Sequence, residues 1–243
     1  MSTRAFVLNC PVDIMGVEEA LVRAKSAVDA GYNYHIVTIN PEMIMYAQDH
    51  LSFYKILKES NLNLADGVGV KIALRLKGVK QEQIRGVDFS RELIKIAAEN
   101  NYRVAFLGAK EEVIELARDN FLKEYPNLNF VYVRNGYFNR EKEVLDEIKE
   151  AKPQILLVGL GSPRQERFIV KLKSELKGCI MVGVGGSFDV FSGIVKESPE
   201  IFRRLGLEWL YRTVLQPERF KRIFPVLPIF LIKCIMSTIQ KKG

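Results

Sequence analysis

The chain has 243 residues, of which 48% are apolar and 27% are charged. This composition is typical of a soluble globular protein, and it excludes a disordered chain, a collagen-like repeat and a small disulfide scaffold. The three cysteines, Cys10, Cys179 and Cys234, are far apart in the sequence and predict no disulfide framework. A chain of this length can bury a substantial core without such staples.

The excess positive charge lies at one end of the chain. The net charge is +7, but residues 1–202 carry 27 basic and 27 acidic side chains, so the whole surplus falls within residues 203–243. A neutral body with a basic tail predicts an anionic partner. A nucleic-acid binder would fit the charge, but the long apolar run in the same tail does not suit a surface that tracks phosphates.

The ends of the chain predict a cytoplasmic protein. The first residues lead into a short apolar run that is broken by Asn9, Pro11 and Asp13, which is not the pattern of a secretory signal. The longest apolar stretch, Ile223–Ile232, is shorter than the roughly 20 residues that a membrane-spanning helix needs.

Short β-branched runs alternate with amphipathic helical stretches. Strands are expected at Tyr34–Thr38, Leu62–Ala65, Val104–Leu107, Phe130–Val133, Ile155–Val158 and Ile180–Val184. Helices are expected at Val17–Ala30, Pro41–Gln48, Val68–Lys77, Phe89–Asn100, Glu111–Tyr125, Arg140–Ala151 and Pro163–Leu176. This order predicts an α/β, Rossmann-like body with a mostly parallel sheet and helices on both faces. The composition changes near Ser198, which predicts a body over residues 1–195 and a helical, basic C-terminal appendage over residues 196–243.

Ligands of open parallel sheets bind beyond the carboxyl ends of the strands, so the polar residues there are the candidates for a site. Asn40, before Pro41, fits a helix N-cap, and the same helix start could bind an anion. Asp66 lies between an expected strand and Gly67. It could act as a general base or merely cap the next helix, and the sequence leaves both open.

Two glycine-rich segments lie farther along the chain. Ser162 and Gln165 have the spacing of a capping box, while Gly159 and Gly161 could let a phosphate approach the backbone. Gly183–Asp189 resembles a dinucleotide fingerprint only loosely, because its spacing is not G-x-G-x-x-G. There Asp189 could accept hydrogen bonds from a ribose or a base, or the segment is simply a tight turn.

No metal site or cofactor is expected from the sequence. His35 and His50 form no metal-binding pattern, and His35 is expected to be a core residue. The chain also has no Asp-x-Asp, the motif by which many nucleotide-sugar transferases hold a metal. A bound diphosphate would have to be neutralised by Arg, Lys and backbone N–H groups.

Taken together, the motifs resemble the WecG/TagA/CpsF glycosyltransferases, in the same order and over nearly the whole chain. They are Thr38-x-Asn40-Pro41-Glu42, Ala65-Asp66-Gly67, Arg85-Gly86-Val87-Asp88, Phe106-Leu107-Gly108, Gly159–Glu166, Gly183-Val184-Gly185-Gly186-x-Phe188-Asp189, Glu208–Arg212 and Gln216-Pro217-x-Arg219. The resemblance implies a metal-independent enzyme with a Rossmann-like fold. It also implies inverting transfer of N-acetylmannosamine from a UDP-sugar to the 4-hydroxyl of N-acetylglucosamine on undecaprenyl diphosphate. The product would be the β-linked disaccharide linkage unit of wall teichoic acid.

The resemblance also implies roles for individual residues. Asp66 matches the catalytic aspartate, and Thr38, Asn40 and Gln165 match polar residues that hold the sugar and the diphosphate. The turn at Gly185 and Gly186, together with Asp189, is expected to hold the uridine, and Arg85 is expected to help near the donor.

The tail is expected to complete the site. Arg212, Arg219 and Arg222 recur at spacings that place them on one helix face, and arginine can donate two hydrogen bonds to a diphosphate. We expect the appendage to fold over the body and to present Arg212 and Arg219 as catalytic groups, with Arg222 binding substrate.

Apolar side chains beside this basic run suit the interface of an anionic bilayer. They are Phe220, Ile223, Phe224, Val226, Leu227, Ile229, Phe230, Leu231 and Ile232. Residues 200–240 are therefore expected to bind the inner face of the cell membrane peripherally. The alternative is that they pack on the body or form an oligomer contact, and a homo-oligomer stays open.

Other functions compatible with the sequence are transfer of a related UDP-hexose or of the N-acetylmannosamine uronate to a polyprenyl-linked acceptor. A different class, a soluble nucleotide-dependent oxidoreductase, would also be allowed by the sheet alone. A nucleic-acid partner is not expected.

Overall fold

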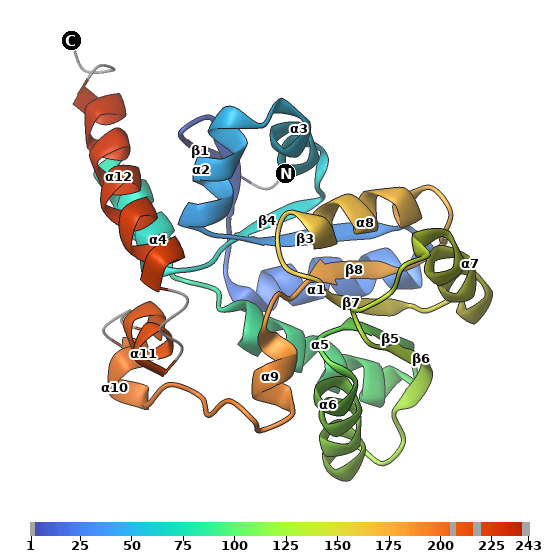
Figure 1. The fold of residues 1–243 in the computed structure, drawn as a ribbon. Coiled ribbons are helices and arrows are strands. Elements are labelled where there is room, and N and C mark those ends of the chain that lie inside the picture. Colours follow the sequence, from blue (N-terminus) through green and yellow to red (C-terminus); the bar gives the residue numbers. More distant parts are fainter. Residues whose placement is uncertain (1–2, 205–207, 216–219, 240–243) are drawn as a thin grey trace.

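The computed structural model describes residues 3–204, 208–215 and 220–239, without the side chains of residues 203–204, 209, 212–213, 215 and 220–225. Its centre is an eight-stranded sheet in the order β1-β2-β4-β3-β8-β7-β5-β6 (Figure 1). β1 (Thr3–Val7) and β2 (Cys10–Ile14) form an antiparallel hairpin, and all other neighbouring strands run parallel. The expected α/β fold with a mostly parallel sheet is confirmed.

The remaining strands lie close to the expected ranges. They are β3 (Tyr34–Ile39), β4 (Leu62–Ala65), β5 (Arg103–Gly108), β6 (Asn129–Arg134), β7 (Ile155–Gly159) and β8 (Ile180–Gly183). The helices of the body are α1 (Val17–Asp29), α2 (Pro41–Asp49), α3 (Leu51–Glu59), α4 (Val68–Leu76), α5 (Gly86–Asn100), α6 (Glu111–Glu124), α7 (Glu141–Ala151), α8 (Arg164–Lys173) and α9 (Ser187–Phe191). The sequence analysis predicts neither the hairpin, nor α3, nor α9.

The hairpin forms in spite of the polar residues that interrupt its sequence. Leu8 and Asn9 both have positive φ, 45° and 66°, as a tight hairpin turn requires. Pro11 pairs opposite Phe6. Asp13 is completely buried. A charged side chain can occupy such a position in a strand only if it has a partner inside the protein.

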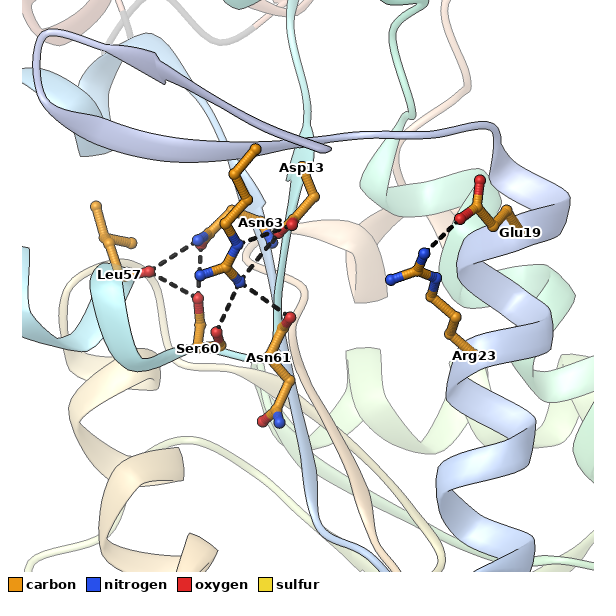
Figure 2. Close-up of polar contacts among 8 residues, drawn as sticks. Asp13, Glu19, Arg23, Leu57, Ser60, Asn61 and Asn63 are labelled. Atoms are coloured by element: carbon orange, nitrogen blue, oxygen red, sulfur yellow. Dashed lines mark hydrogen bonds and ion pairs between the residues drawn. The ribbon is translucent and has the colours of Figure 1, made fainter. Parts of the chain in front are cut away.

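That partner is Arg4 on the neighbouring strand, and Figure 2 shows the contacts around Asp13. Arg4 Nε donates to Asp13 Oδ1 at 2.8 Å, and Arg4 Nη2 donates to the carbonyl oxygens of Ser60 and Asn61 at 3.0 and 3.1 Å. Asn63 N donates to Asp13 Oδ2 at 2.7 Å. These bonds attach the hairpin to the turn between α3 and β4, and they satisfy a charge that would be costly to bury alone.

Helices cover both faces of the sheet because successive strand side chains point to opposite sides. Ile36 of β3 and Val182 of β8 belong to a core cluster with α1, α5 and α6. Val37 of β3 instead packs with α2, α3 and α4, and Met181 of β8 packs with α7 and α8.

The C-terminal part contains α10 (Glu200–Arg204), α11 (Glu208–Leu215) and α12 (Phe220–Ile239). α12 lies along α4 (Figure 1) and buries Phe230 and Cys234 in the same cluster as residues of α2 and α4. A Cβ on Gly69 would lie 2.6 Å from Pro41 Cγ and 2.9 Å from Leu227 Cδ1, so this glycine allows α2, α4 and α12 to meet. The domain boundary at residue 195 stays a prediction, but α12 contributes to the core of the body.

The exposed apolar side chains of α12 lie elsewhere on the helix. They are Ile229, Ile232, Ile235, Met236 and Ile239. The expected apolar segment therefore divides into a buried part and an exposed part. Among the described residues, no helix combines the length and apolarity needed to cross a bilayer.

We predict that Asp13→Asn destabilises the protein by about 2–3 kcal/mol, because it leaves the Arg4 guanidinium and the Asn63 amide without their carboxylate. Urea unfolding measures this difference. The control is Glu19→Gln, which removes the exposed Glu19–Arg23 ion pair that Figure 2 also shows. That change should cost less than about 0.5 kcal/mol. Equal effects of the two substitutions would contradict the role given to Asp13.

Candidate active site at the carboxyl edge of the sheet

A cavity of about 790 Å³ lies beyond the carboxyl ends of β3, β4, β7 and β8. The chain moves outward from β3 to β4 on one side and returns through β7 and β8 on the other, so the strand order reverses between β3 and β8. Crevices at such a reversal are where open α/β sheets bind ligands.

Most of the predicted site residues meet in this cavity. Its lining includes Thr38, Asn40, Asp66, Arg85, Gln165, Gly185 and Gly186. Asp189 of α9 is half-buried and is not among the lining residues.

The structure does not describe the side chains of the three predicted arginines of the tail. Arg219 lies outside the described residues, as do the side chains of Arg212 on α11 and Arg222 on α12. Their convergence on the cavity stays a prediction.

Asn40 acts as a helix cap at the cavity wall. Its Oδ1 accepts a hydrogen bond from Met43 N at 3.0 Å, and Pro41 is the first residue of α2. The capping interpretation is confirmed, and the same residue also lines the cavity.

Asp66 does not cap the helix that follows it. The N-cap of α4 is Gly67, and no side chain bonds there. Asp66 Oδ2 instead accepts from Gly86 N at 3.3 Å, and Oδ1 accepts from Gln83 Nε2 at 3.3 Å. Gly86 is the first residue of α5, so the partial positive charge of that helix start stabilises the carboxylate.

The capping box expected for Ser162 and Gln165 is wrong. α8 begins at Arg164 without a side-chain cap. Gln165 Oε1 accepts from Gly185 N at 3.0 Å, and its Nε2 donates to Glu166 Oε1 at 2.8 Å. Gln165 therefore ties the turn after β8 to α8. A Cβ on Gly183 would lie 2.5 Å from Gln165 Nε2, so a larger residue there would displace the Gln165 amide.

Glu166 is 1% exposed, so its carboxyl group is almost fully removed from solvent. Its Oε2 has no hydrogen-bond partner within the described part of the chain. Burial raises the pKa of this carboxyl, and the hydrogen bond from Gln165 only partly opposes that effect.

Arg85 is already engaged by two carboxylates. Its Nη1 donates to Asp88 Oδ2 at 2.7 Å and its Nε donates to Glu208 Oε2 at 2.8 Å. The side chains of Arg85 and Glu208 are 12% and 13% exposed. Arg85 is thus not a free cation for a diphosphate. Sequence reasoning missed Glu208 and Gln83 as site residues.

A pair of stacked rings forms another part of the cavity wall. Tyr46 and His50 of the α2 region are parallel, with centroids 3.7 Å apart, and Arg167 Nη2 donates to Tyr46 Oη at 3.3 Å. His35 is a core residue as expected, and burial lowers its pKa to about 3. Across the described residues, no group of three or more His, Cys, Asp or Glu side chains could hold a metal ion.

The raised pKa of Glu166 predicts that the stability of the protein depends on pH. Above about pH 4.5 the unfolded carboxyl loses its proton, whereas the buried one retains it until its raised pKa is reached, so folding becomes less favourable as pH rises through that window. Glu166→Gln removes this penalty. The variant should melt at a higher temperature than the wild type at neutral pH, and the difference should vanish below about pH 4.5.

The control is Glu147→Gln. Glu147 accepts a hydrogen bond from Arg134, which lowers the pKa of the Glu147 carboxyl. Ionised Glu147 therefore stabilises the fold, so the Glu147→Gln variant should lose stability at neutral pH. Melting curves across this pH range measure both variants. A Glu166→Gln protein that is less stable than the wild type at neutral pH would show that the carboxylate is stabilised by its surroundings.

Comparisons with known proteins identify the family of the chain. Residues 5–243 match a family described as "Glycosyl transferase WecG/TagA/CpsF family". A Staphylococcus aureus (strain NCTC 8325 / PS 47) protein named N-acetylglucosaminyldiphosphoundecaprenol N-acetyl-beta-D-mannosaminyltransferase is 39% identical over 203 residues, which are 83% of this chain and 79% of that protein. The protein of the same name from strain MRSA252 is 38% identical over 203 residues, with the same coverage.

The family match covers almost the whole length of the chain. The chain is a glycosyltransferase and belongs to the WecG/TagA/CpsF family.

Proposed function

We propose that the protein transfers N-acetylmannosamine from UDP-N-acetylmannosamine to the 4-hydroxyl of N-acetylglucosamine on undecaprenyl diphosphate. The transfer inverts the anomeric carbon, yields a β-1,4 linkage and needs no metal. The names of the Staphylococcus aureus relatives support this acceptor and this sugar. The observation that carries the proposal is the Asp66 carboxylate on the wall of the cavity.

Asp66 is the proposed general base. Its carboxylate lines the cavity and accepts from Gly86 N and Gln83 Nε2, both at the long distance of 3.3 Å, and we expect it to take the proton of a sugar hydroxyl. The deprotonated oxygen then forms a bond to the anomeric carbon as the bond to the UDP oxygen breaks. UDP departs with the electron pair of that bond.

The donor is proposed to lie between the turns after β3 and β8. Thr38, Asn40 and Gln165 would hold the sugar and the diphosphate, and Gly185 and Gly186 would let the nucleotide approach the backbone. Asp189 would contact the uridine from behind this turn. Arg212, Arg219 and Arg222 would neutralise the departing diphosphate, so the reaction should proceed in the presence of a chelator.

The outward part of α12 is the proposed membrane contact. Ile232 and Met236 are more than half exposed, and Lys233 between them is also exposed. Leu227 of the same helix lines the cavity. An acceptor could therefore keep its lipid in the bilayer while its sugar reaches the site. Exposed apolar side chains beside a basic residue suit a bilayer interface.

Asp66→Asn should lower the turnover number for transfer by about 100-fold or more, because a positioned general base contributes about 10²–10⁴. Its affinity for UDP should remain within about twofold, because the amide preserves the shape of the side chain. A transfer assay with the lipid-diphosphate acceptor and calorimetry with UDP measure the two quantities. Asp146→Asn on the exposed face of α7 is the control. Near-normal turnover of Asp66→Asn would exclude this residue as the base.

The membrane contact predicts that Ile232→Glu combined with Met236→Glu lowers retention on anionic liposomes, because two charges enter the apolar face. Transfer to a water-soluble acceptor should be unchanged. The control is Val22→Glu, which places a charge on an exposed apolar residue of α1. Equal retention of the α12 variant and the wild type on liposomes would remove α12 as the contact.

A further inference from the structure

We propose that Glu208 is a positioning residue for the transfer reaction: through Arg85, it holds the start of α5 and thereby the catalytic carboxylate of Asp66. The inference rests on the proposed function, because it assigns a role in the alignment of that base. It also gives α11 a role in aligning the active site, which is separate from membrane contact.

The first link joins the appendage to the body. Glu208 is the first residue of α11, and its Oε2 accepts from Arg85 Nε at 2.8 Å. The two residues are 123 positions apart in the chain, and both line the cavity. Asp88 holds the other side of the guanidinium at 2.7 Å. A planar guanidinium held by two carboxylates has little freedom to turn.

The second link reaches the base. Arg85 is the N-cap of α5, and the next amide, Gly86 N, donates to Asp66 Oδ2 at 3.3 Å. The backbone at Gly86 packs close to β3, because a Cβ added there would lie 3.1 Å from Thr38 Oγ1. Fixing Arg85 therefore fixes the amide that orients Asp66.

The chemistry of the ion pair suits positioning better than stability. Arg85 Nη2 and Glu208 Oε1 are buried, and neither has a hydrogen-bond partner among the residues that the structure describes. A buried ion pair with unsatisfied atoms contributes little to folding, because desolvation offsets the attraction between the charges. What this pair does provide is a fixed direction for the backbone at Arg85.

A second ion pair on α5 provides the comparison. Arg91 Nη2 donates to Glu197 Oε1 at 2.6 Å, so it also ties α5 to the segment that leads to α10. These two side chains are 35% and 28% exposed, and neither lines the cavity. Loss of this ion pair weakens the attachment of α5 to the segment before α10 but leaves the hydrogen bonds of Asp66 in place.

It follows that the site is aligned only when α11 is docked. If α11 moves away, Arg85 loses one of its two carboxylates, and the start of α5 is less constrained. Turnover should therefore depend on Glu208 even with a water-soluble acceptor, for which the membrane is irrelevant.

The experiment compares Glu208→Gln with Glu197→Gln in the full chain, using UDP-N-acetylmannosamine and a short-chain lipid-diphosphate acceptor. Glu208→Gln should lower kcat about tenfold or more and leave KM for the donor within about twofold, because small misplacements of a catalytic group reduce rate rather than binding. Glu197→Gln should stay within about twofold of the wild type in both. In an Arg85→Gln background, Glu208→Gln should have no further effect, since Glu208 acts through Arg85.

A measurement that does not depend on activity accompanies the kinetics. Hydrogen exchange of the Gly86 amide, followed by NMR, should be about tenfold faster in Glu208→Gln than in the wild type or in Glu197→Gln. Unchanged exchange at Gly86, wild-type kcat in Glu208→Gln, or an equal loss of kcat in both variants would overturn the inference. If the wild type transfers no sugar but Gly86 still responds, the proposed function fails while the coupling of Glu208 to the start of α5 stands.

Discussion

The reversal of strand order between β3 and β8 is the constraint on which the site depends. The chain leaves β3 toward one edge of the sheet and returns to its other side through β7 and β8, so the turns after four parallel strands open into one cavity. Each turn brings one element of the site: Asn40 after β3, Asp66 after β4, Gly161 after β7 and Gly185 after β8. No single motif could form this site, because every part is completed by a strand that is distant in sequence.

Two networks hold the walls of the cavity in place. On one side, Gln165 joins the turn at Gly185 to the start of α8. On the other, the first amide of α5 and the Gln83 side chain hold Asp66, while Arg85 connects the same helix start to α11. The cavity wall is completed by Leu227 of α12, a helix whose Phe230 is buried in the core. α12 is therefore packed against the core of the body, while other apolar residues of this helix are exposed.

The strands and most helices could be predicted because buried parallel strands are short β-branched runs and amphipathic helices repeat with the helical period. The hairpin could not, because Asp13 appears as a polar interruption until Arg4 is placed beside it. Position after a strand identified Asp66 as a candidate, whereas the roles of Asp66 and Gln165 came from the family resemblance. Two contacts at the site could not be predicted: Gln83 is 17 positions from its partner Asp66, and Glu208 is 123 positions from its partner Arg85, so no local pattern predicts them. The capping box failed for a related reason, since Gln165 bonds to the distant Gly185 instead of its own helix start.

The most direct test of the account is an experimental structure of the protein with UDP bound. The account predicts that the diphosphate lies in the cavity between the turns after β3 and β8, near Gly185, with the Asp66 carboxylate facing the position of the anomeric carbon. A nucleotide bound outside this cavity, or one bound with Asp66 turned away from the diphosphate, would contradict it.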